Sequence, residues 1–409
     1  MMAEYYKPEE TLAPELREQQ LMAGLAEQLS YAKANCSYYA ELLADIEVTS
    51  VDSREALATL PITRKADLIA LQAKLPPFAG MTPNKPSGRI FQSPGPIYDP
   101  ECDGHDWWRM GQAFFAAGFR AGDLVQNCLS YHLTPGGFIM DSGAKACGCT
   151  VIPAGPGQSE MQLDLIASLK PTGYCGTPSF LNILLEKGKA LGKDTSSITK
   201  ALVSGEALTP SLKASFEAAD INVKQAYATA DLGLIAFESV SGEGLVVAEG
   251  IIVEIVRPGT LSPVPEGEVG EVVVTSFNRD YPLVRFATGD LSAILPGASP
   301  CGRTNVRIKG WLGRADQTTK VKGLFVHPEQ VERIRSRHPG IAKVRLVVSR
   351  QQENDVMHLL CEVDEAMRPQ VDISAVQDSI RAETQLSGEV ALVAPGALAD
   401  DGVVIEDQR

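Results

Sequence analysis

The 409-residue chain lacks the features that would place it in a membrane or on nucleic acid. No run of 18 apolar residues occurs, so no membrane span is predicted. The first residues contain neither a basic stretch nor an apolar stretch, and we expect no signal peptide. Basic residues are the scarcer charge, with 37 Lys and Arg against 51 Asp and Glu. The resulting net charge of −14 argues against a nucleic-acid partner, because neutralising phosphates requires an excess of Lys and Arg.

Cysteine and histidine are also sparse, with eight and five residues scattered along the chain. Cys301 has no neighbouring Cys or His, whereas a structural zinc site needs four ligands, so we do not expect zinc. Scattered thiols in apolar runs suit a reducing compartment, and we expect a cytoplasmic protein. The hydrophobic content of 44% and charged content of 22% are typical of a soluble globular protein of two or three domains.

The hydrophobic pattern changes three times along the chain. Residues 9–46 show helical spacing, and Thr63 is predicted to cap a further helix. From about residue 105, where a helix is predicted over 107–119, helical stretches alternate with short apolar runs up to Tyr227. Such alternation is typical of βαβ units that form a parallel sheet.

After Asp231 the apolar runs are short and separated by Gly and Pro turns, which favours a small antiparallel sheet or barrel. The last residues follow an α+β pattern. We therefore predict an α/β fold with a large N-terminal domain, residues 1–313, of parallel βαβ sheets plus the small antiparallel sheet. A small, mobile α+β C-terminal domain, residues 314–409, is joined to it by a hinge.

Two polar strings follow predicted strands of the parallel sheet. Ser204-Gly-Glu206 lies between a strand and a helix, which is where α/β sheets bind ligands, although ordinary strand–Gly–helix turns look the same. Tyr227-Ala-Thr-Ala-Asp231 ends the next strand. A Tyr can stack on a purine and an Asp can hold Mg²⁺ through its oxygens, while the alternative is a turn with a packed Tyr.

Two further strings lie nearer the C-terminus. Thr288-Gly-Asp290 follows a predicted strand, so its carboxylate can accept hydrogen bonds from ribose hydroxyls, unless the string is only a hairpin turn. Gly313-Arg-Ala-Asp316 with Lys320-Val-Lys-Gly323 links the two predicted domains. A Gly next to an exposed Asp can absorb large backbone changes, so this segment is either a hinge or an ordinary charged linker.

Taken together, these strings resemble the adenylate-forming enzymes, which include the acyl-CoA synthetases, and most closely the phenylacetate–CoA ligase group. The group's Tyr-Gly-x-Ser/Thr-Glu element is similar to 227–231, and its Arg-Tyr-Arg-Thr-Gly-Asp element is similar to Arg285-Phe-Ala-Thr-Gly-Asp290. Its Gly-Arg-x-Asp-Asp element is similar to 313–317, and its Leu-Pro-Phe/Ile-Thr-x-Lys start to Leu60-Pro-Ile-Thr-Arg-Lys65. The resemblance spans residues 5–406.

The resemblance implies a two-step reaction in which ATP and a carboxylic acid give an acyl-adenylate, which the thiol of coenzyme A then attacks. It implies that Asp231 acts catalytically and holds Mg²⁺, that Lys322 acts in the second step, and that Asp316 is the hinge. It also implies a small-molecule acid, ATP/AMP and CoA as partners, and a homodimer. The residues implied to bind the nucleotide are Ser204, Gly205, Glu206, Ala226, Tyr227, Ala228, Thr229, Asp290 and Arg314.

The string Tyr131-His-Leu-Thr-Pro-Gly-Gly-Phe138 lies where the group has a Gly-rich turn beside the acyl pocket. The resemblance therefore implies that Tyr131, Gly136, Gly137 and Phe138 line this pocket. His132 is expected to be a packed or surface histidine and not a base.

The phosphate loop departs from the group. The group has Ser-Ser-Gly-Thr-Thr-Gly-Lys-Pro, whereas this chain has Phe91-Gln-Ser-Pro-Gly-Pro-Ile-Tyr-Asp-Pro100. Proline has no N–H to offer a phosphate, and only Ser93 and Gly95 remain of the Ser, Thr and Gly set. Asp99 adds a negative charge, so the loop is expected to bind the β- and γ-phosphates poorly.

The C-terminus departs as well. The group ends in Gly-Lys-x-x-Arg-Val-Ile-Asp, but here the sequence is Ala399-Asp-Asp-Gly-Val-Val-Ile-Glu406 and no lysine follows Lys343. A lysine there would neutralise charge on the transferring phosphoryl group. Three functions stay open: an ATP-dependent carboxylate–CoA ligase, a degenerate homologue that only binds nucleotide or acyl ligand, and an acyl-transferring enzyme that performs one partial reaction.

Overall fold

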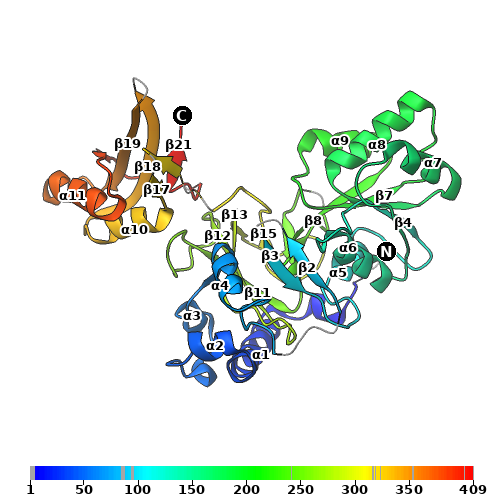
Figure 1. Ribbon diagram of the computed structural model, residues 1–409, viewed down its shortest axis with the longest axis horizontal. Helices are drawn as coiled ribbons and strands as arrows, with labels where there is room; N and C mark the ends of the chain where they lie inside the picture. Colours follow the sequence, from blue (N-terminus) through cyan, green and yellow to red (C-terminus); the bar gives the residue numbers. More distant parts are fainter. Residues whose placement is uncertain are drawn as a thin grey trace. The chain divides into compact units, whose positions relative to one another are not determined.

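A computed structural model describes residues 5–83, 88–93, 96–240, 242–315, 317, 319–322, 324–351, 354–399 and 401–408 (Figure 1). The chain forms two compact units, each built from three segments. The first unit comprises Met1–Val253, Val274–Phe286 and Leu295–Trp311. The second comprises Glu254–Val273, Ala287–Ile294 and Leu312–Arg409. The domain boundary at residue 313 stays a prediction.

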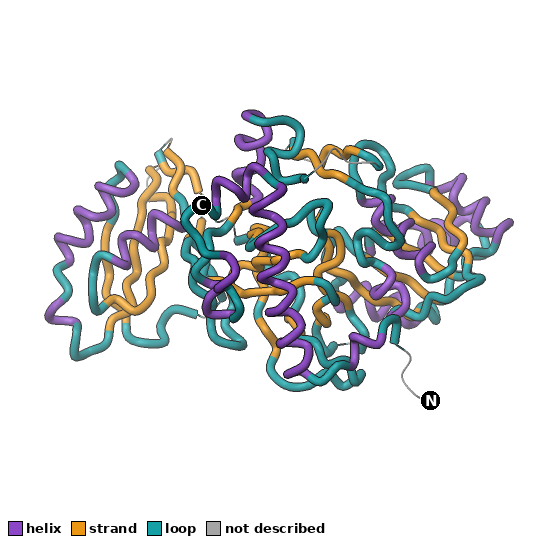
Figure 2. Tube along the Cα trace, turned by 90° about the horizontal axis from the view of Figure 1, so that it is seen from below, coloured by secondary structure: helices purple, strands orange, loops and turns teal. Residues whose placement is uncertain are grey.

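The N-terminal part of the first unit is helical, as the sequence predicts. The 22-residue helix α1, Pro14–Asn35, is the long purple helix in Figure 2. Shorter helices and 3₁₀ turns follow or precede it: Pro8–Thr11, α2 (Ser37–Leu42), Val48–Ser50, α3 (Arg54–Ala58), Lys65–Asp67 and α4 (Leu68–Lys74). Ser53 caps α3 by accepting the N–H of Ala56 at 3.2 Å.

The prediction that Thr63 caps a helix is wrong. Thr63 and Arg64 form the short strand β1, and the N–H of Thr63 donates to the carbonyl of Arg285 at 3.1 Å. The hydroxyl of Thr63 lies 3.0 Å from that of Tyr38. A partner more than 200 residues away in the sequence thus decides the local structure.

The N-terminal segment is fastened to a distant part of the first unit. Glu10 is 1% exposed and its Oε2 accepts from Arg303 Nε at 2.7 Å. Arg17 pairs with Glu249 at 3.0 Å and donates to the hydroxyl of Thr304. Burial raises the pKa of the Glu10 carboxyl in spite of Arg303, so the segment is held by buried polar contacts.

A nine-stranded sheet forms the centre of the first unit. Its order is β14-β15-β10-β9-β8-β7-β6-β4-β5, and the pairs from β8 to β5 are parallel. The strands are β4 (Leu124–Asn127), β5 (Thr150–Pro153), β6 (Gly173–Gly176), β7 (Lys200–Val203), β8 (Asn222–Thr229), β9 (Gly233–Phe237), β10 (Leu245–Val247), β14 (Ile294–Leu295) and β15 (Arg307–Ile308). Strands β9 and β10 continue this sheet in antiparallel pairing, where the sequence predicts a separate sheet.

Helices connect the parallel strands. They are α5 (Gly111–Ala116), α6 (Gly136–Ala146), α7 (Ser159–Leu169), α8 (Pro178–Leu191) and α9 (Pro210–Ala218). Helix α5 is shorter than the predicted 107–119, because Arg109 and Gly118 have φ of +64° and +90°, which a right-handed helix cannot contain. Apolar residues of α7, α8 and α9 pack on the sheet in one core with Tyr174, Ala201 and Val223.

The strand order reverses at β4. The chain runs from β4 to β5 on one side and then returns to β6 on the other side of β4. In open α/β sheets, ligands bind outside the carboxyl ends of the strands at such a switch point. The loops after β4 and β6 are therefore the first place to look for a pocket.

A second sheet has the order β1-β13-β12-β11. Besides β1, its strands are β11 (Ile251–Val256), β12 (Gly270–Ser276) and β13 (Phe286–Ser292). The hairpin of β2 (Ile90–Ser93) and β3 (Ile97–Pro100) stands apart as a two-stranded sheet. None of the helices that the structure describes combines the length and apolar character required to span a bilayer.

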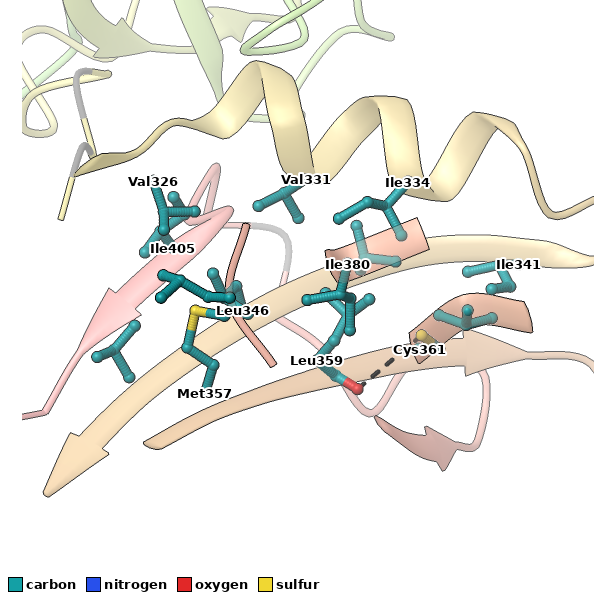
Figure 3. Packing of buried hydrophobic residues seen from close by; sticks show 14 of the residues in the cluster. Val326, Val331, Ile334, Ile341, Leu346, Met357, Leu359, Cys361, Ile380 and Ile405 are labelled. Atoms are coloured by element: carbon teal, nitrogen blue, oxygen red, sulfur yellow. Dashed lines mark hydrogen bonds between the residues drawn. The ribbon is translucent and has the colours of Figure 1, made fainter. Parts of the chain in front are cut away.

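The C-terminal part of the second unit is the predicted α+β arrangement. Its sheet has the order β20-β19-β18-β21, and the separate hairpin β16–β17 precedes this sheet in the sequence. The elements are β16 (Thr319–Val321), β17 (Leu324–Val326), α10 (Pro328–Ser336), β18 (Ile341–Gln351), β19 (Asn354–Val363), a 3₁₀ turn (Arg368–Gln370), α11 (Ile373–Thr384), β20 (Glu389–Val393) and β21 (Ile405–Asp407). Val331 and Ile334 of α10 point toward the sheet residue Leu346, closing an apolar core (Figure 3).

Candidate functional site

The ends of three parallel strands are tied to one another by Ser204. Its N–H donates to the carbonyl of Gly176 at 3.0 Å, and its hydroxyl donates to the carbonyl of Ala226 at 2.8 Å. Ser204 is buried, whereas Gly205 and Glu206 after it are exposed. The loop after β7 thus presents exposed backbone at the edge where the carboxyl ends of β6, β7 and β8 meet.

Strand β8 places the second predicted string at the same edge. Ala226 and Tyr227 are buried, Ala228 and Thr229 are half-buried, and the pairing with β9 shifts between Tyr227 and Ala228. The hydroxyl of Thr229 accepts the N–H of Leu232 at 3.2 Å and so closes the turn. Asp231 follows directly and is buried, which is unusual for an aspartate in a turn.

The burial of Asp231 is compensated by Lys65. Lys65 Nζ lies 2.6 Å from Asp231 Oδ2, and the side chains are 23% and 0% exposed. Lys65 ends the motif Leu60–Lys65 that is similar to the group's, but the sequence gives no reason to pair it with Asp231, 166 residues away. Asp231 Oδ1 has no hydrogen-bond partner among the described residues.

The hairpin β2–β3 occupies the position of the predicted degenerate phosphate loop. Ser93 pairs with Ile97, so only residues 94–96 connect the strands. Gly95 lies outside the described residues, and Ser93 is buried with its hydroxyl donating to Asp99 Oδ2 at 2.5 Å. This hydroxyl is therefore engaged inside the hairpin. Burial first, and then the nearby Asp231 carboxylate, raise the pKa of Asp99.

The predicted acyl-pocket residues lie together at the switch point after β4. Asn127 Nδ2 donates to the Tyr131 hydroxyl at 2.7 Å and to the carbonyl of Gly137 at 2.8 Å. The Tyr131 hydroxyl lies 3.4 Å from Asp141 Oδ1, and burial is the largest cause that raises its pKa. The sequence reasoning missed Asn127, although a polar residue that ends a buried strand at a switch point is a usable signal.

Gly137 is the position where this turn requires a glycine. A Cβ there would lie 2.8 Å from the carbonyl oxygen of Ser130 and 2.8 Å from the ring of Tyr131, whereas one at Gly136 would make only ordinary contacts at 3.8 Å. The main chain of α6 can therefore approach Tyr131 closely. His132 is exposed in the preceding turn, as predicted for a histidine without a catalytic task.

Aromatic rings continue from Tyr131 toward the hairpin. The Phe138 ring lies 5.1 Å from Tyr131 and 5.3 Å from Phe91, and Phe91 lies 6.1 Å from Trp108, measured between centroids. The Arg89 guanidinium covers Phe138 at 4.5 Å. Phe91, Tyr131, Phe138 and Trp108 thus form a continuous aromatic cluster.

In the second unit, Asp290 is held by Arg314. Arg314 Nη1 lies 2.9 Å from Asp290 Oδ1, and the side chains are 55% and 10% exposed. Asp290 lies inside β13 and not after it, because the backbone of 289–291 pairs with 312–315. Gly289 has a φ of +77°, and a Cβ there would lie 2.7 Å from the Arg314 guanidinium.

Lys322 lies at the exposed turn of the hairpin β16–β17, where its N–H donates to Asp355 Oδ2 at 3.1 Å. The predicted hinge residue Asp316 lies outside the described residues. Lys343 donates to the carbonyls of Leu398 and Ala399, so β18 holds the chain just before 399–406. The structure therefore groups the strand-end and acyl-pocket residues in the first unit, and Asp290, Arg314 and Lys322 in the second.

Comparisons with known proteins match the parts of the chain that carry these residues. A family model described as AMP-binding enzyme matches residues 110–278. A phenylacetate-coenzyme A ligase of Thermus thermophilus is 28% identical over 397 residues, which cover 92% of this chain and 88% of that protein. One of Pseudomonas putida is 30% identical over 342 residues, which cover 80% of this chain and 76% of that protein.

Solved structures agree in fold. A crystal structure of an open conformation of 2-hydroxyisobutyryl-CoA ligase, in complex with 2-HIB-AMP and CoA, matches with a TM-score of 0.73. The match covers 97% of this chain and 92% of that chain at 23% sequence identity. At this identity the likeness speaks for the fold alone.

Proposed function

Because the chain belongs to the phenylacetate–coenzyme A ligase family of adenylate-forming enzymes, we propose that it is an ATP-dependent ligase that joins a carboxylic acid to coenzyme A through an acyl-adenylate. Membership confirms the resemblance drawn from the motif strings, and the fold confirms the predicted α/β class. The observation that carries the proposal is the match to a ligase along 92% of the chain, both predicted domains included.

In the first unit, the backbone of Ser204–Glu206 and the ring of Tyr227 are proposed to bind the adenine. A Tyr face suits a purine because offset stacking of aromatic rings is favourable. In the second unit, Asp290 is proposed to accept hydrogen bonds from ribose hydroxyls, which requires Arg314 to share or release the carboxylate. A half-exposed Arg314 can do so at little cost, because a surface ion pair contributes only about 0–1 kcal/mol.

The acid is proposed to be an aryl acid. The aromatic cluster of Phe91, Tyr131, Phe138 and Trp108 suits an aromatic ring by edge-to-face contacts. Asn127 holds Tyr131 and the carbonyl of Gly137 in place, so the wall of the pocket is preorganised.

Magnesium fits Asp231. A buried carboxylate oxygen without a hydrogen-bond partner among the described residues is the kind of oxygen ligand that Mg²⁺ prefers. When bound, the ion would neutralise negative charge on the phosphates. Lys65 keeps the other oxygen of Asp231 in place. The homodimer and the cytoplasmic location stay predictions.

A degenerate homologue, or an enzyme of the second step only, is favoured by one observation. The hairpin β2–β3 has only residues 94–96 between its strands, so few backbone N–H groups are available to phosphates. A protein of this kind would bind AMP or an acyl-adenylate, whose single phosphate needs no such loop.

One assay separates these functions. The protein is incubated with ATP, Mg²⁺, CoA and a panel of aryl and short fatty acids, and AMP and acyl-CoA are measured. The ligase predicts turnover with at least one acid, and an about 100-fold loss in Asp290→Ala, because bonds to a charged acceptor contribute about 1.5–3 kcal/mol each. If the wild type shows no more turnover than Asp290→Ala, the ligase function is contradicted. A thermal shift with AMP but without turnover favours the binding protein. Formation of a CoA ester only from a supplied acyl-adenylate favours the enzyme of the partial reaction.

A further inference from the structure

The hairpin β2–β3, which stands where the group has its phosphate loop, is bonded to the turn that carries the acyl-pocket residues. The N–H of Gln92 in β2 donates to the carbonyl of Leu133 at 2.9 Å. Leu133 has a φ of +62° and is 58% exposed, so an unfavourable backbone conformation coincides with an exposed apolar side chain. Such a conformation persists only where the surroundings hold it, and the hairpin supplies one of the bonds that do so.

Two side chains from the start of the hairpin hold the Phe138 ring. The Phe91 ring lies 5.3 Å from it between centroids, and the Arg89 guanidinium lies over it at 4.5 Å. Phe91 is 4% exposed, whereas Phe138 is half-buried and so remains partly accessible to a ligand. Phe91 therefore packs behind the accessible ring, and both neighbours from the hairpin restrict how Phe138 can move.

The hairpin itself is fixed by helix α4. Nε2 of Gln72 in α4 donates to the carbonyl of Tyr98 in β3 at 2.8 Å, and Oε1 of Gln72 accepts the N–H of Tyr98 at 2.8 Å. Gln72 is 3% exposed, so water competes little for these bonds. A two-stranded hairpin is marginally stable on its own, and this anchor makes it a firm support for Phe91 and for the turn at Leu133.

We propose that the hairpin β2–β3 selects the acid, and that Phe91 is a positioning residue that acts through Phe138. The proposal rests on the proposed function, because the selected molecule is the acid of that reaction. Phe91 fills the space behind Phe138, so this ring cannot move back to admit a second fused ring. The substrate class is therefore acids with a single aromatic ring. The segment that matches the group's phosphate loop thus serves the acid instead of the nucleotide.

The test compares phenylacetate with 2-naphthylacetate, which has two fused rings, in the ligase assay with ATP and CoA on the full chain. In Phe91→Leu we expect kcat/KM for the two acids to shift by about 10-fold toward 2-naphthylacetate, since a methylene-sized change in a pocket is worth about 10- to 200-fold. The KM for ATP should stay unchanged, because Phe91 acts on the acid alone. Ile90→Ala, on the opposite face of the same strand at a 55% exposed position, is the matched control and should change neither value.

Arg89→Leu is a second variant, which removes the cation over Phe138, and we expect the KM for phenylacetate to rise about 2- to 5-fold. Glu101→Gln weakens only the ion pair that Arg89 makes at 2.7 Å and should not change this KM. Circular dichroism shows whether each variant is folded. If Phe91→Leu does not fold, an unchanged KM in Arg89→Leu overturns the proposal.

The proposal is also overturned if folded Phe91→Leu keeps the wild-type preference between the two acids, or if its KM for ATP rises as much as its KM for phenylacetate. Either result, with turnover in the wild type, leaves the proposed function intact. If the wild type turns over neither acid, the same acids are titrated by calorimetry. Binding whose preference depends on Phe91 then overturns only the proposed function, whereas the absence of binding overturns both.

Discussion

Two aspartates proposed to serve the nucleotide are each paired with a base, but at very different depths. Asp231 and Lys65 lie 2.6 Å apart with side chains 0% and 23% exposed, whereas Asp290 and Arg314 lie 2.9 Å apart with side chains 10% and 55% exposed. The chemistry of the two pairs is similar, so the difference lies in the surrounding solvent. An ion pair removed from water interacts strongly and is costly to break, while an exposed one is screened and easily exchanged.

The difference suits two different tasks. A carboxylate that must hold a cation in one position benefits from a fixed, dry environment, whereas one that must release its partner to bind a ribose benefits from access to water. The Asp231 carboxylate is therefore held in position before a ligand binds, whereas the Asp290 carboxylate becomes available when Arg314 releases it.

The largest expected effect comes from removing the lysine that pairs with the buried Asp231. Lys65→Met leaves Asp231 as an unpaired buried charge, and we expect a loss of about 3–5 kcal/mol in the free energy of unfolding. Arg314→Met is the matched control and is expected to cost about 0–1 kcal/mol. Urea unfolding measures both; equal losses would remove the distinction between the two pairs.

The exposed pair depends on a glycine that the buried pair does not need. Gly289→Ala places a side chain at a φ of +77° and 2.7 Å from the Arg314 guanidinium. We expect a cost of about 1–2 kcal/mol from the backbone conformation alone, plus a weaker Asp290–Arg314 pair. Gly297→Ala, at a φ of +82° with no atom within 4 Å, is the control for the backbone term. Thermal unfolding of both should show the larger loss at Gly289.

The pH dependence of stability tests the burial of the acid next to the Asp231 pair. The pKa of Asp99, beside Asp231, is raised in the folded state by burial and by that carboxylate. The folded chain therefore holds a proton that the unfolded chain has already lost, so this contribution is present at acidic pH and is lost as pH rises through the folded pKa. In EDTA we expect stability to fall by up to about 1.4 kcal/mol per pH unit in that window.

Asp99→Asn should remove this slope in urea unfolding carried out at a series of pH values. A slope that persists in Asp99→Asn would have to come from another buried acid, such as Glu10, whose pKa burial also raises.

The smallest expected effect is the response to salt. A double-mutant cycle for Asp290 and Arg314 should give about 0.2–1 kcal/mol at low salt and almost nothing at 1 M NaCl, where the screening length is about 3 Å. The same cycle for Asp231 and Lys65 should change little with salt. Comparable salt dependence in both cycles would mean that water reaches Asp231.

Much of the fold could be predicted from local sequence patterns. The sequence predicts a strand over 251–256 and helices over 328–336 and 373–384, and β11, α10 and α11 have these bounds because their apolar spacing and caps are local signals. Thr63 was assigned to a helix cap wrongly because Arg285 recruits it into a strand. Helix α5 begins later than predicted because Arg109 adopts a positive φ, for which the sequence gives no warning.

The sequence predicts which strand ends carry the site residues, but it does not predict which side chains pair with one another. Ser204, Tyr227 and Asp231 could be found because polar residues that end buried strands are visible in the sequence. Lys65 and Asp99 could not be joined to Asp231, because each lies more than 130 residues away in the chain and only tertiary packing brings them together.

The ion pair between Glu10 and Arg303 determines how late in synthesis the N-terminal segment can complete its folding. Glu10 finds its partner only when Arg303 has been made, 293 residues later. At about 5–20 residues per second, a ribosome needs roughly 15–60 s to travel that distance. Until then Glu10 lacks its counter-charge Arg303, so the first unit cannot reach its final state while the chain is short. Truncated products that stop before Arg303 should therefore expose the N-terminal helices to proteolysis and to chaperones.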